Sequence, residues 1–174
     1  MVSDSWLAGL LRTRVMPRVM GLALRTASVQ RIFFRTISQT GIRYRTSPLS
    51  EALAGLPEAG ARAGDRFPWL RLRLQANGPA EDLFGRLEDT RFNLIVVGQA
   101  APAGGVPALG DLLRIHEVPS DAANDRALAR VHIPSPSFYL LRPDGHVGLA
   151  GTRLDVPAAT RYVAERLHLR PTGA

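Results

Sequence analysis

Residues 137–151 read SFYLLRPDGHVGLAG, and this stretch decides how the end of the fold is built. Five mostly apolar residues lead into Arg-Pro-Asp-Gly and a second short apolar run leads away from it, which predicts a β-hairpin. Pro143 fixes φ, Asp144 tolerates turn geometry, and Gly145 supplies a positive φ. Arg142 and Asp144 resemble a pair of site residues, but turn chemistry explains them. We therefore interpret Arg142, Pro143, Asp144 and Gly145 as a structural turn.

The clearest strand before the hairpin is FNLIVV at residues 92–97, a near-continuous apolar run rich in β-branched residues. Such a run predicts a central strand that is buried on both faces. Further strands are expected at 69–74, 113–118, 138–141 and 146–149. Helical segments are expected at 80–87, near 106–112, as a turn at 125–130, and at 156–169, where Val156, Thr160, Val163 and Leu167 share one stripe.

The order of these elements predicts the α/β fold class. Alternating strands and helices favour a mixed sheet with helices on both faces. A final antiparallel hairpin followed by one helix is how a thioredoxin-like domain ends, and we predict such a domain over residues 69–174. Pro136 stands where thioredoxin-like folds often place a cis-proline. Trans is the commoner state of an X–Pro bond, so both states stay open.

Residues 1–45 are predicted to form an amphipathic helical arm, and residues 46–68, rich in Pro and Gly, an extended connector. Apolar residues recur every three or four positions along the arm, if Thr26 fills one gap: Leu11, Val15, Val19, Leu22, Val29, Phe33 and Ile37. Pro17 is expected to kink or split this helix. We favour packing of the stripe on a protein body over two alternatives, a membrane-surface helix and an organelle transit peptide.

Composition excludes several kinds of chemistry. All 22 basic residues are arginine, and residues 1–50 hold eight of them with one acid, whereas residues 51–174 hold 14 arginines and 14 acids. The excess charge therefore belongs to the arm, and we expect no nucleic-acid partner. Without cysteine or lysine, the chain has no disulfide, thiolate zinc site, thiol chemistry or Schiff-base lysine. No segment has the ~18 consecutive apolar residues of a membrane span, and we expect a cytoplasmic protein.

Four segments carry a resemblance to a known family: RYRTSPLS (43–50), AGARAGDRFPWL (59–70), DLFGRLEDTRFNLIVVG (82–98) and FYLLRPDGHVGLAG (138–151). They resemble, in family order, the C-terminal region of FAD-dependent aromatic hydroxylases of the phenol hydroxylase and pentachlorophenol monooxygenase type. GDRFPWL and LLRPDGHV are the most specific pieces. The resemblance implies a thioredoxin-like domain without redox cysteines, preceded by helices. It also implies that the flavin fold and the substrate pocket come earlier in the chain of such an enzyme.

The flavin motifs of that family are missing here. A Gly-x-Gly-x-x-Gly run would open a helix after a strand, whereas GHVGLAG at residues 145–151 has the wrong spacing and leaves a hairpin. The pairs Gly64-Asp65 and Gly110-Asp111 lack the residues around the second flavin motif. We therefore expect no FAD on this chain, although FAD serves the full-length family, and we predict no cofactor-binding and no catalytic residues.

The favoured function is a non-catalytic C-terminal domain or fragment of an FAD-dependent monooxygenase. It would dock on a flavin-bearing part or self-associate through the arm stripe. A free-standing cysteine-less thioredoxin-like binding module is one alternative, and a membrane- or organelle-targeted protein that uses the basic arm is another.

Other candidate site residues favour structural roles. The four histidines show no metal-ligand spacing, and Ser135 and Ser137 lack a nucleophile-elbow motif, so we predict no metal site and no serine nucleophile. Trp6 and Trp69 could stack a ligand, but core or interface packing is the more common role.

Overall fold

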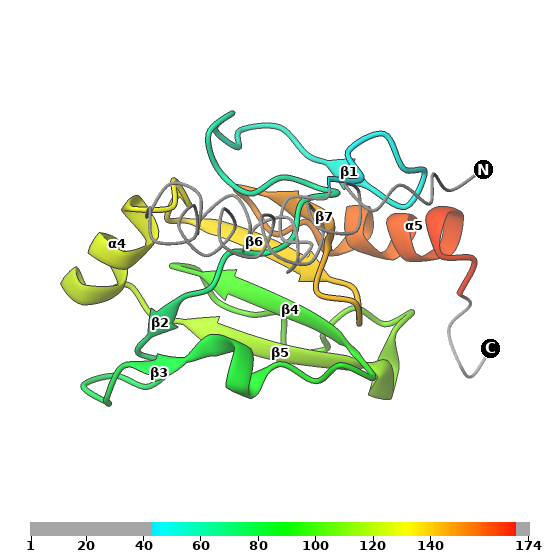
Figure 1. Ribbon diagram of the computed structural model, residues 1–174. Helices are drawn as coiled ribbons and strands as arrows, with labels where there is room; N and C mark the ends of the chain where they lie inside the picture. Colours follow the sequence, from blue (N-terminus) through cyan, green and yellow to red (C-terminus); the bar gives the residue numbers. More distant parts are fainter. Residues whose placement is uncertain (1–42, 170–174) are drawn as a thin grey trace, which may run out of the picture. The chain divides into compact units, whose positions relative to one another are not determined.

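The computed structural model describes residues 43–169 and shows a mixed α/β fold (Figure 1). Most of the predicted arm, including its stripe Leu11, Val15, Val19, Leu22, Val29, Phe33 and Ile37, lies outside the described residues. So does Trp6. Among the described residues, no helix has the length and apolar character needed to cross a membrane.

A five-stranded mixed sheet forms the centre of the domain, with strand order β1-β7-β6-β4-β5. Its members are β1 (Glu51–Ala52), β4 (Phe92–Val97), β5 (Leu113–Val118), β6 (Ser137–Leu141) and β7 (Val147–Gly151). β4 and β5 are parallel, β6 is antiparallel to both β4 and β7, and β1 is parallel to β7. A separate two-stranded sheet pairs β2 (Arg71–Leu72) with β3 (Glu81–Asp82).

Two α-helices and two 3-10 helices complete the described elements. They are α4 (Ala122–Ala129), α5 (Val156–Arg166), and the 3-10 helices Leu83–Arg86 and Gly110–Leu112. The sequence predicts β4 and β5 with the bounds that the structure has, because β-branched runs bounded by turn residues are strong strand signals.

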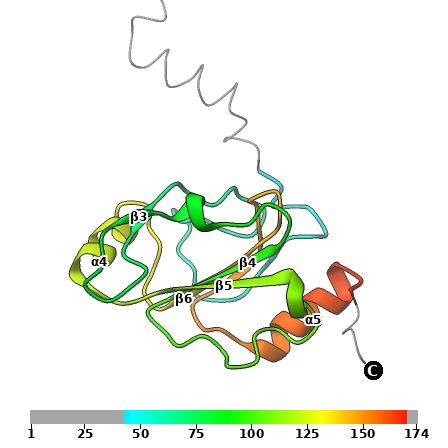
Figure 2. The ribbon, with the colours of Figure 1, turned by 90° about the horizontal axis from the view of Figure 1, so that it is seen from below.

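Each face of the sheet has its own hydrophobic core. Ile95, Tyr139 and Leu141 face a cluster that includes Leu128 of α4 and side chains from the segment around β2 and β3. Leu94 and Leu140 face the other cluster, which α5 covers. Figure 2 shows α5 and β3 on opposite sides of the sheet. This arrangement agrees with the expected mixed sheet that has helices on both faces.

Four expected elements are shorter than predicted or differ in kind. The predicted helix at 156–169 ends at Arg166. The predicted helix at 80–87 is strand β3 followed by a 3-10 helix, and Gly85 lies inside that short turn. The predicted helix near 106–112 is a 3-10 helix at its end only, because Gly105 and Gly110 have positive φ. The predicted strand at 69–74 is ordered as a strand only over β2.

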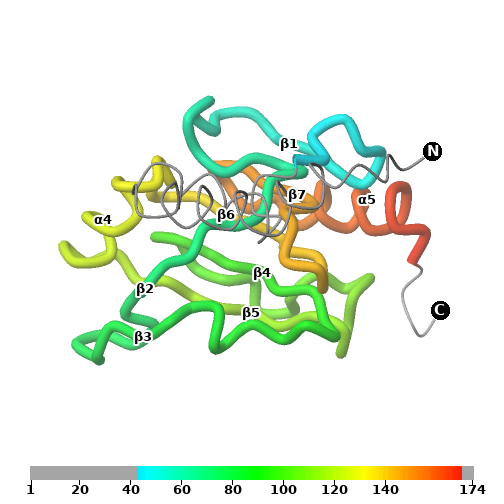
Figure 3. Tube along the Cα trace, in the orientation of Figure 1, coloured from blue at the N-terminus to red at the C-terminus, as the bar shows by residue number. Residues whose placement is uncertain are grey.

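The segment expected to be an element-free connector, residues 46–68, lies against the sheet. It contains β1, and its Ala63 and Phe67 are buried in the core. Figure 3 traces this segment alongside β7. Pro and Gly residues predicted a linker, but the backbone groups between them form hydrogen bonds with the hairpin.

Candidate functional site

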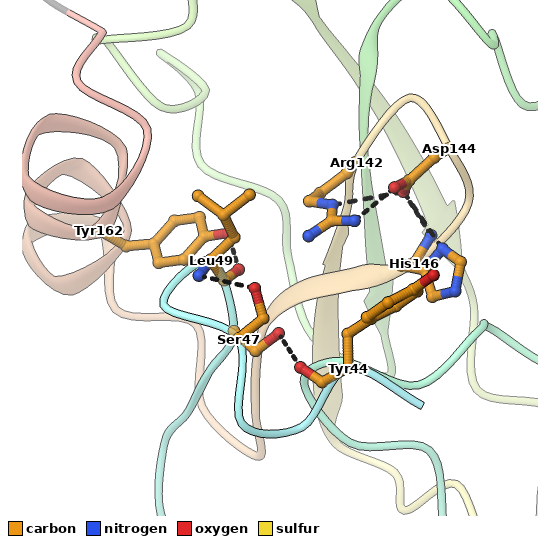
Figure 4. Close-up of polar contacts among 8 residues, drawn as sticks. Tyr44, Ser47, Leu49, Arg142, Asp144, His146 and Tyr162 are labelled. Atoms are coloured by element: carbon orange, nitrogen blue, oxygen red, sulfur yellow. Dashed lines mark hydrogen bonds and ion pairs between the residues drawn. The ribbon is translucent and has the colours of Figure 1, made fainter. Parts of the chain in front are cut away.

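The hairpin turn is held by hydrogen bonds among its own residues. Gly145 N donates to the Arg142 carbonyl over 2.9 Å, and Gly145 has φ +78°. Asp144 Oδ1 accepts from His146 N over 3.0 Å, and the Arg142 guanidinium pairs with the same carboxylate (Figure 4). Partial burial raises the pKa of Asp144, but these donors outweigh it and hold that pKa below its ordinary value. Arg142 and Asp144 therefore neutralise each other's charge within the turn.

The segment at residues 43–50 lies on this hairpin through a chain of backbone hydrogen bonds. Tyr44 N donates to the Gly64 carbonyl over 2.7 Å, and Gly64 N donates to the Val147 carbonyl over 2.7 Å. Val147 N returns a bond to the Asp65 carbonyl over 2.9 Å. We call this network, built from residues 43–50, 62–67 and 142–148, the junction. It brings together three of the four segments that carry the family resemblance.

Gly64 is a residue that the junction requires to be glycine. Its φ is +87°, and a Cβ at this position would overlap the Tyr44 carbonyl and the Arg45 nitrogen. A side chain here would therefore push the segment at residues 43–50 off the hairpin.

A buried carboxylate anchors the same segment. Asp65 is 8% exposed and receives two hydrogen bonds from the Arg45 guanidinium, Nε to Oδ1 over 2.8 Å and Nη2 to Oδ2 over 2.6 Å. Arg62 N donates a third bond to Oδ2 over 3.1 Å. Arg43 Nε lies farther away, 3.8 Å from Oδ1. This bidentate pairing neutralises a charge that would be costly to bury alone.

His146 occupies the centre of the junction. The residue is 8% exposed, and its ring meets the Tyr44 ring edge-on with 5.2 Å between centroids. Nδ1 lies 3.4 Å from Asp144 Oδ1, and neither ring nitrogen makes a hydrogen bond to any residue in the range 43–169. The histidine therefore packs as an aromatic ring beside a carboxylate.

Tyr162 of α5 joins the junction from the other face of the sheet. Its hydroxyl donates to the Leu49 carbonyl over 2.8 Å, as Figure 4 shows, and burial raises the pKa of Tyr162 to about 12. The hydroxyl also lies over Gly148, where a Cβ would overlap it. The sequence pattern missed Tyr162, because it placed the stripe of the helix on Val156, Thr160, Val163 and Leu167, of which only Val163 is fully buried. A glycine inside a strand, such as Gly148, was the available signal of a close approach.

The other candidate residues are dispersed. His116 Nε2 lies 3.0 Å from Asn93 Oδ1, whereas His132 and His168 lie at the ends of α4 and α5. Within residues 43–169, no group of three His, Asp or Glu side chains could hold a metal ion. Ser137 donates to the Pro134 carbonyl over 2.6 Å, the Ser135–Pro136 peptide bond is cis, and Trp69 is 62% exposed.

Neither α4 nor α5 offers a free N-terminus to a flavin pyrophosphate. Phosphates bind at helix N-termini, where free backbone N–H groups point outward. The carboxylate of Asp121 already caps α4, accepting from Ala123 N and Asn124 N, and that of Asp155 caps α5, accepting from Ala158 N. A phosphate would have to displace a negative charge at either helix.

No protein-family model matches the sequence, and no curated protein matches it. Solved structures do share its fold, and they are FAD-dependent aromatic hydroxylases and monooxygenases. OxyS, the anhydrotetracycline hydroxylase from Streptomyces rimosus, is 20% identical with a TM-score of 0.53, over 94% of this chain and 30% of its own.

Two further structures were solved with a flavin bound. Aklavinone-11 hydroxylase, in a ternary complex with FAD and aklavinone, is 20% identical with a TM-score of 0.51, over 74% of this chain and 26% of its own. The flavin-dependent monooxygenase PieE, in complex with FAD and substrate, is 19% identical with a TM-score of 0.51. That match covers 96% of this chain and 31% of PieE. The chain thus spans about 30% of the length of the structures it matches, and at this identity the likeness shows a shared fold.

Proposed function

We propose that this chain is the C-terminal region of an FAD-dependent aromatic-compound monooxygenase and serves there as a non-catalytic docking and structural domain. The observation that carries the proposal is the coverage: nearly all of this chain matches less than a third of OxyS and of PieE. The sequence motifs add the C-terminal placement, since they resemble that part of the family. FAD would then belong to the part of the enzyme that this chain does not contain.

The junction supports a docking role over a catalytic one. Two pairs of its charged side chains neutralise each other, Arg45 with Asp65 and Arg142 with Asp144. The Arg45–Asp65 pair ties the segment at residues 43–50 to residues 62–67, whose backbone is bonded to the hairpin, and the Arg142–Asp144 pair lies within the hairpin turn. The arm is expected to lead from a flavin-bearing part into this segment, and we propose that the domain begins at residue 43 and includes the predicted connector.

We also propose that the domain is thioredoxin-like. The support is the arrangement of strands β5-β4-β6-β7, with a parallel pair, an antiparallel hairpin and a final helix. Where a redox thioredoxin carries Cys-x-x-Cys after its first central strand, this chain has GQAAPAGG at residues 98–105. Thiol exchange has no reactive group there.

Flavin retention tests the proposal that FAD does not bind to this chain. The purified full chain is mixed with excess FAD and passed through a desalting column, and we expect no flavin absorbance in the protein fraction. Stoichiometric FAD on the chain, or NAD(P)H oxidation by the chain alone, would contradict the proposal.

The coding DNA tests the proposal that the chain is the C-terminal region of a larger monooxygenase. Translation of the region upstream of Met1 in all frames is expected to yield a Gly-x-Gly-x-x-Gly flavin fold, in frame or one frameshift away. An unrelated upstream region, together with a monodisperse monomer of the full chain, would favour the alternative function. That alternative is a free-standing cysteine-less binding module, and it is supported by the two separate cores that residues 43–169 build on the sheet.

A further inference from the structure

A hollow of about 150 Å³ lies between the hairpin turn and the loop that precedes β4. Four of its lining residues are apolar, Phe84, Leu87, Leu141 and Pro143, and most of the others are charged or polar. An enclosed apolar cavity of about this volume holds one six-membered ring, whereas this hollow is open to solvent on one side. Its size and mixed lining therefore suit a compact molecule that has both a hydrocarbon part and a charged group.

Hydrogen bonds hold both walls of the hollow in place. On one side, the buried Asn93 accepts from Glu88 N over 3.1 Å and donates to the Glu88 carbonyl over 2.8 Å and the Arg91 carbonyl over 3.1 Å. On the other side, Asp144 fixes the turn by accepting from His146 N and Arg142. A site whose walls are fixed beforehand loses little conformational freedom when a ligand enters.

Some of the charged groups around the hollow form ion pairs and others do not. Glu88 pairs with Arg91 and Arg114, and Asp144 pairs with Arg142. Arg66 and Asp89 also line the hollow, and neither makes an ion pair with any residue of the described range 43–169.

Arg66 is the better placed of these two charges. Its guanidinium lies against the turn, with Nη2 3.9 Å from the position that a Cβ of Gly145 would take. A guanidinium offers a planar fork of donors that matches a carboxylate.

We propose that this hollow binds a small organic monoanion with a ring-sized apolar body. Arg66 holds the anionic group, and Phe84 with Leu87 and Pro143 holds the hydrocarbon. Asp89 at the rim opposes the negative charge and limits the affinity. The proposal goes beyond the docking function above and does not depend on it, because it requires neither flavin nor a partner chain.

The test is a titration of the full chain, followed by ¹H–¹⁵N NMR, with cyclohexanecarboxylate and its neutral isostere cyclohexanecarboxamide. We expect saturable shifts at residues 84–93 and 141–146, with the carboxylate bound more tightly than the amide. Added salt should lower the affinity for the carboxylate and leave the affinity for the amide unchanged. Shifts that do not saturate, or equal affinity for the two compounds, would overturn the proposal.

Variants assign the roles of the side chains. Arg66→Gln should lower the affinity for cyclohexanecarboxylate about tenfold, so that the carboxylate no longer binds more tightly than the amide. Asp89→Asn should raise the affinity for the carboxylate about two- to fivefold. Arg161→Gln is the matched control, because Arg161 is an exposed arginine of α5 outside the hollow and should change neither affinity. Arg66→Gln with native affinity for the carboxylate would refute the assignment.

Discussion

Gly145 is the residue of the hairpin turn that adopts the left-handed conformation, with φ +78°. A β-branched side chain is strained in this conformation, and Gly145→Val is therefore expected to cost about 1–2 kcal/mol of unfolding free energy. Urea denaturation measures the loss. Asp144→Ala is the control in the same turn, and it should cost less because the backbone conformation is unaffected. A valine variant as stable as the native chain would show that the turn does not need a glycine.

The pKa of Asp144 also predicts a pH dependence. Because the folded-state pKa lies below the unfolded value of about 3.9, the stabilisation from this carboxylate is present above that pH and is lost as the pH falls. The native chain and Asp144→Ala should therefore differ in stability at pH 7, by about 1 kcal/mol or less, and converge in acid. Denaturation curves from about pH 7 down to about pH 2.5 check this, and a constant difference would contradict it.

Gly148 and Tyr162 form a tight contact between strand and helix. Gly148→Ala would place a methyl group against the Tyr162 hydroxyl and should cost about 1–3 kcal/mol. Tyr162→Phe removes both that hydroxyl and its hydrogen bond to the Leu49 carbonyl, at a cost of about 1 kcal/mol. When Tyr162→Phe is already present, Gly148→Ala should cost less, and a double-mutant cycle measures this coupling. Additive effects would show that the two residues do not meet.

At the scale of elements, the bulge in β7 explains why Val147 and Leu149 lie in different cores. Leu140 pairs with Leu149, but Leu141 pairs with Val147, so Gly148 is an extra residue in the ladder. Val147 and Leu149 would share a face in a regular strand. The extra residue turns Val147 into one core and Leu149 into the other.

The ion pair that holds the segment at residues 43–50 gives an element-scale prediction. Arg45→Ala leaves the Asp65 carboxylate buried without its bidentate partner and should cost about 1–3 kcal/mol, with Arg45 itself partly exposed. Arg43→Ala is a matched control, because Arg43 is more exposed and 3.8 Å from Asp65, so it should cost about 0.5 kcal/mol or less. Thermal denaturation compares them, and equal losses would contradict a specific role of Arg45.

The whole molecule predicts where truncation becomes harmful. The predicted arm ends at residue 45, but Tyr44 and Arg45 belong to the junction. A chain that starts at residue 43 should keep a cooperative thermal transition, because residues 43–169 contain both cores. A chain that starts at residue 54 also loses β1 and the Tyr162 contact, and its transition should fall clearly. Equal transitions of the two truncations would show that the segment contributes nothing.

The sequence by itself determined the mixed sheet, the bounds of β4 and β5, and the final hairpin with its helix. These features follow from local patterns, since runs of apolar residues and turn residues act over a few positions. The missing flavin motif and the family resemblance were also visible there.

Only the tertiary structure decided that residues 43–68 are part of the domain. Their Pro and Gly content is the same in a linker and in a segment whose backbone pairs with a distant hairpin. The bonds from Tyr44 to Gly64 and from Gly64 to Val147 join groups far apart in the chain, so no local pattern encodes them. The same holds for Gly148 and Tyr162, whose contact depends on how a helix packs across a bulged strand.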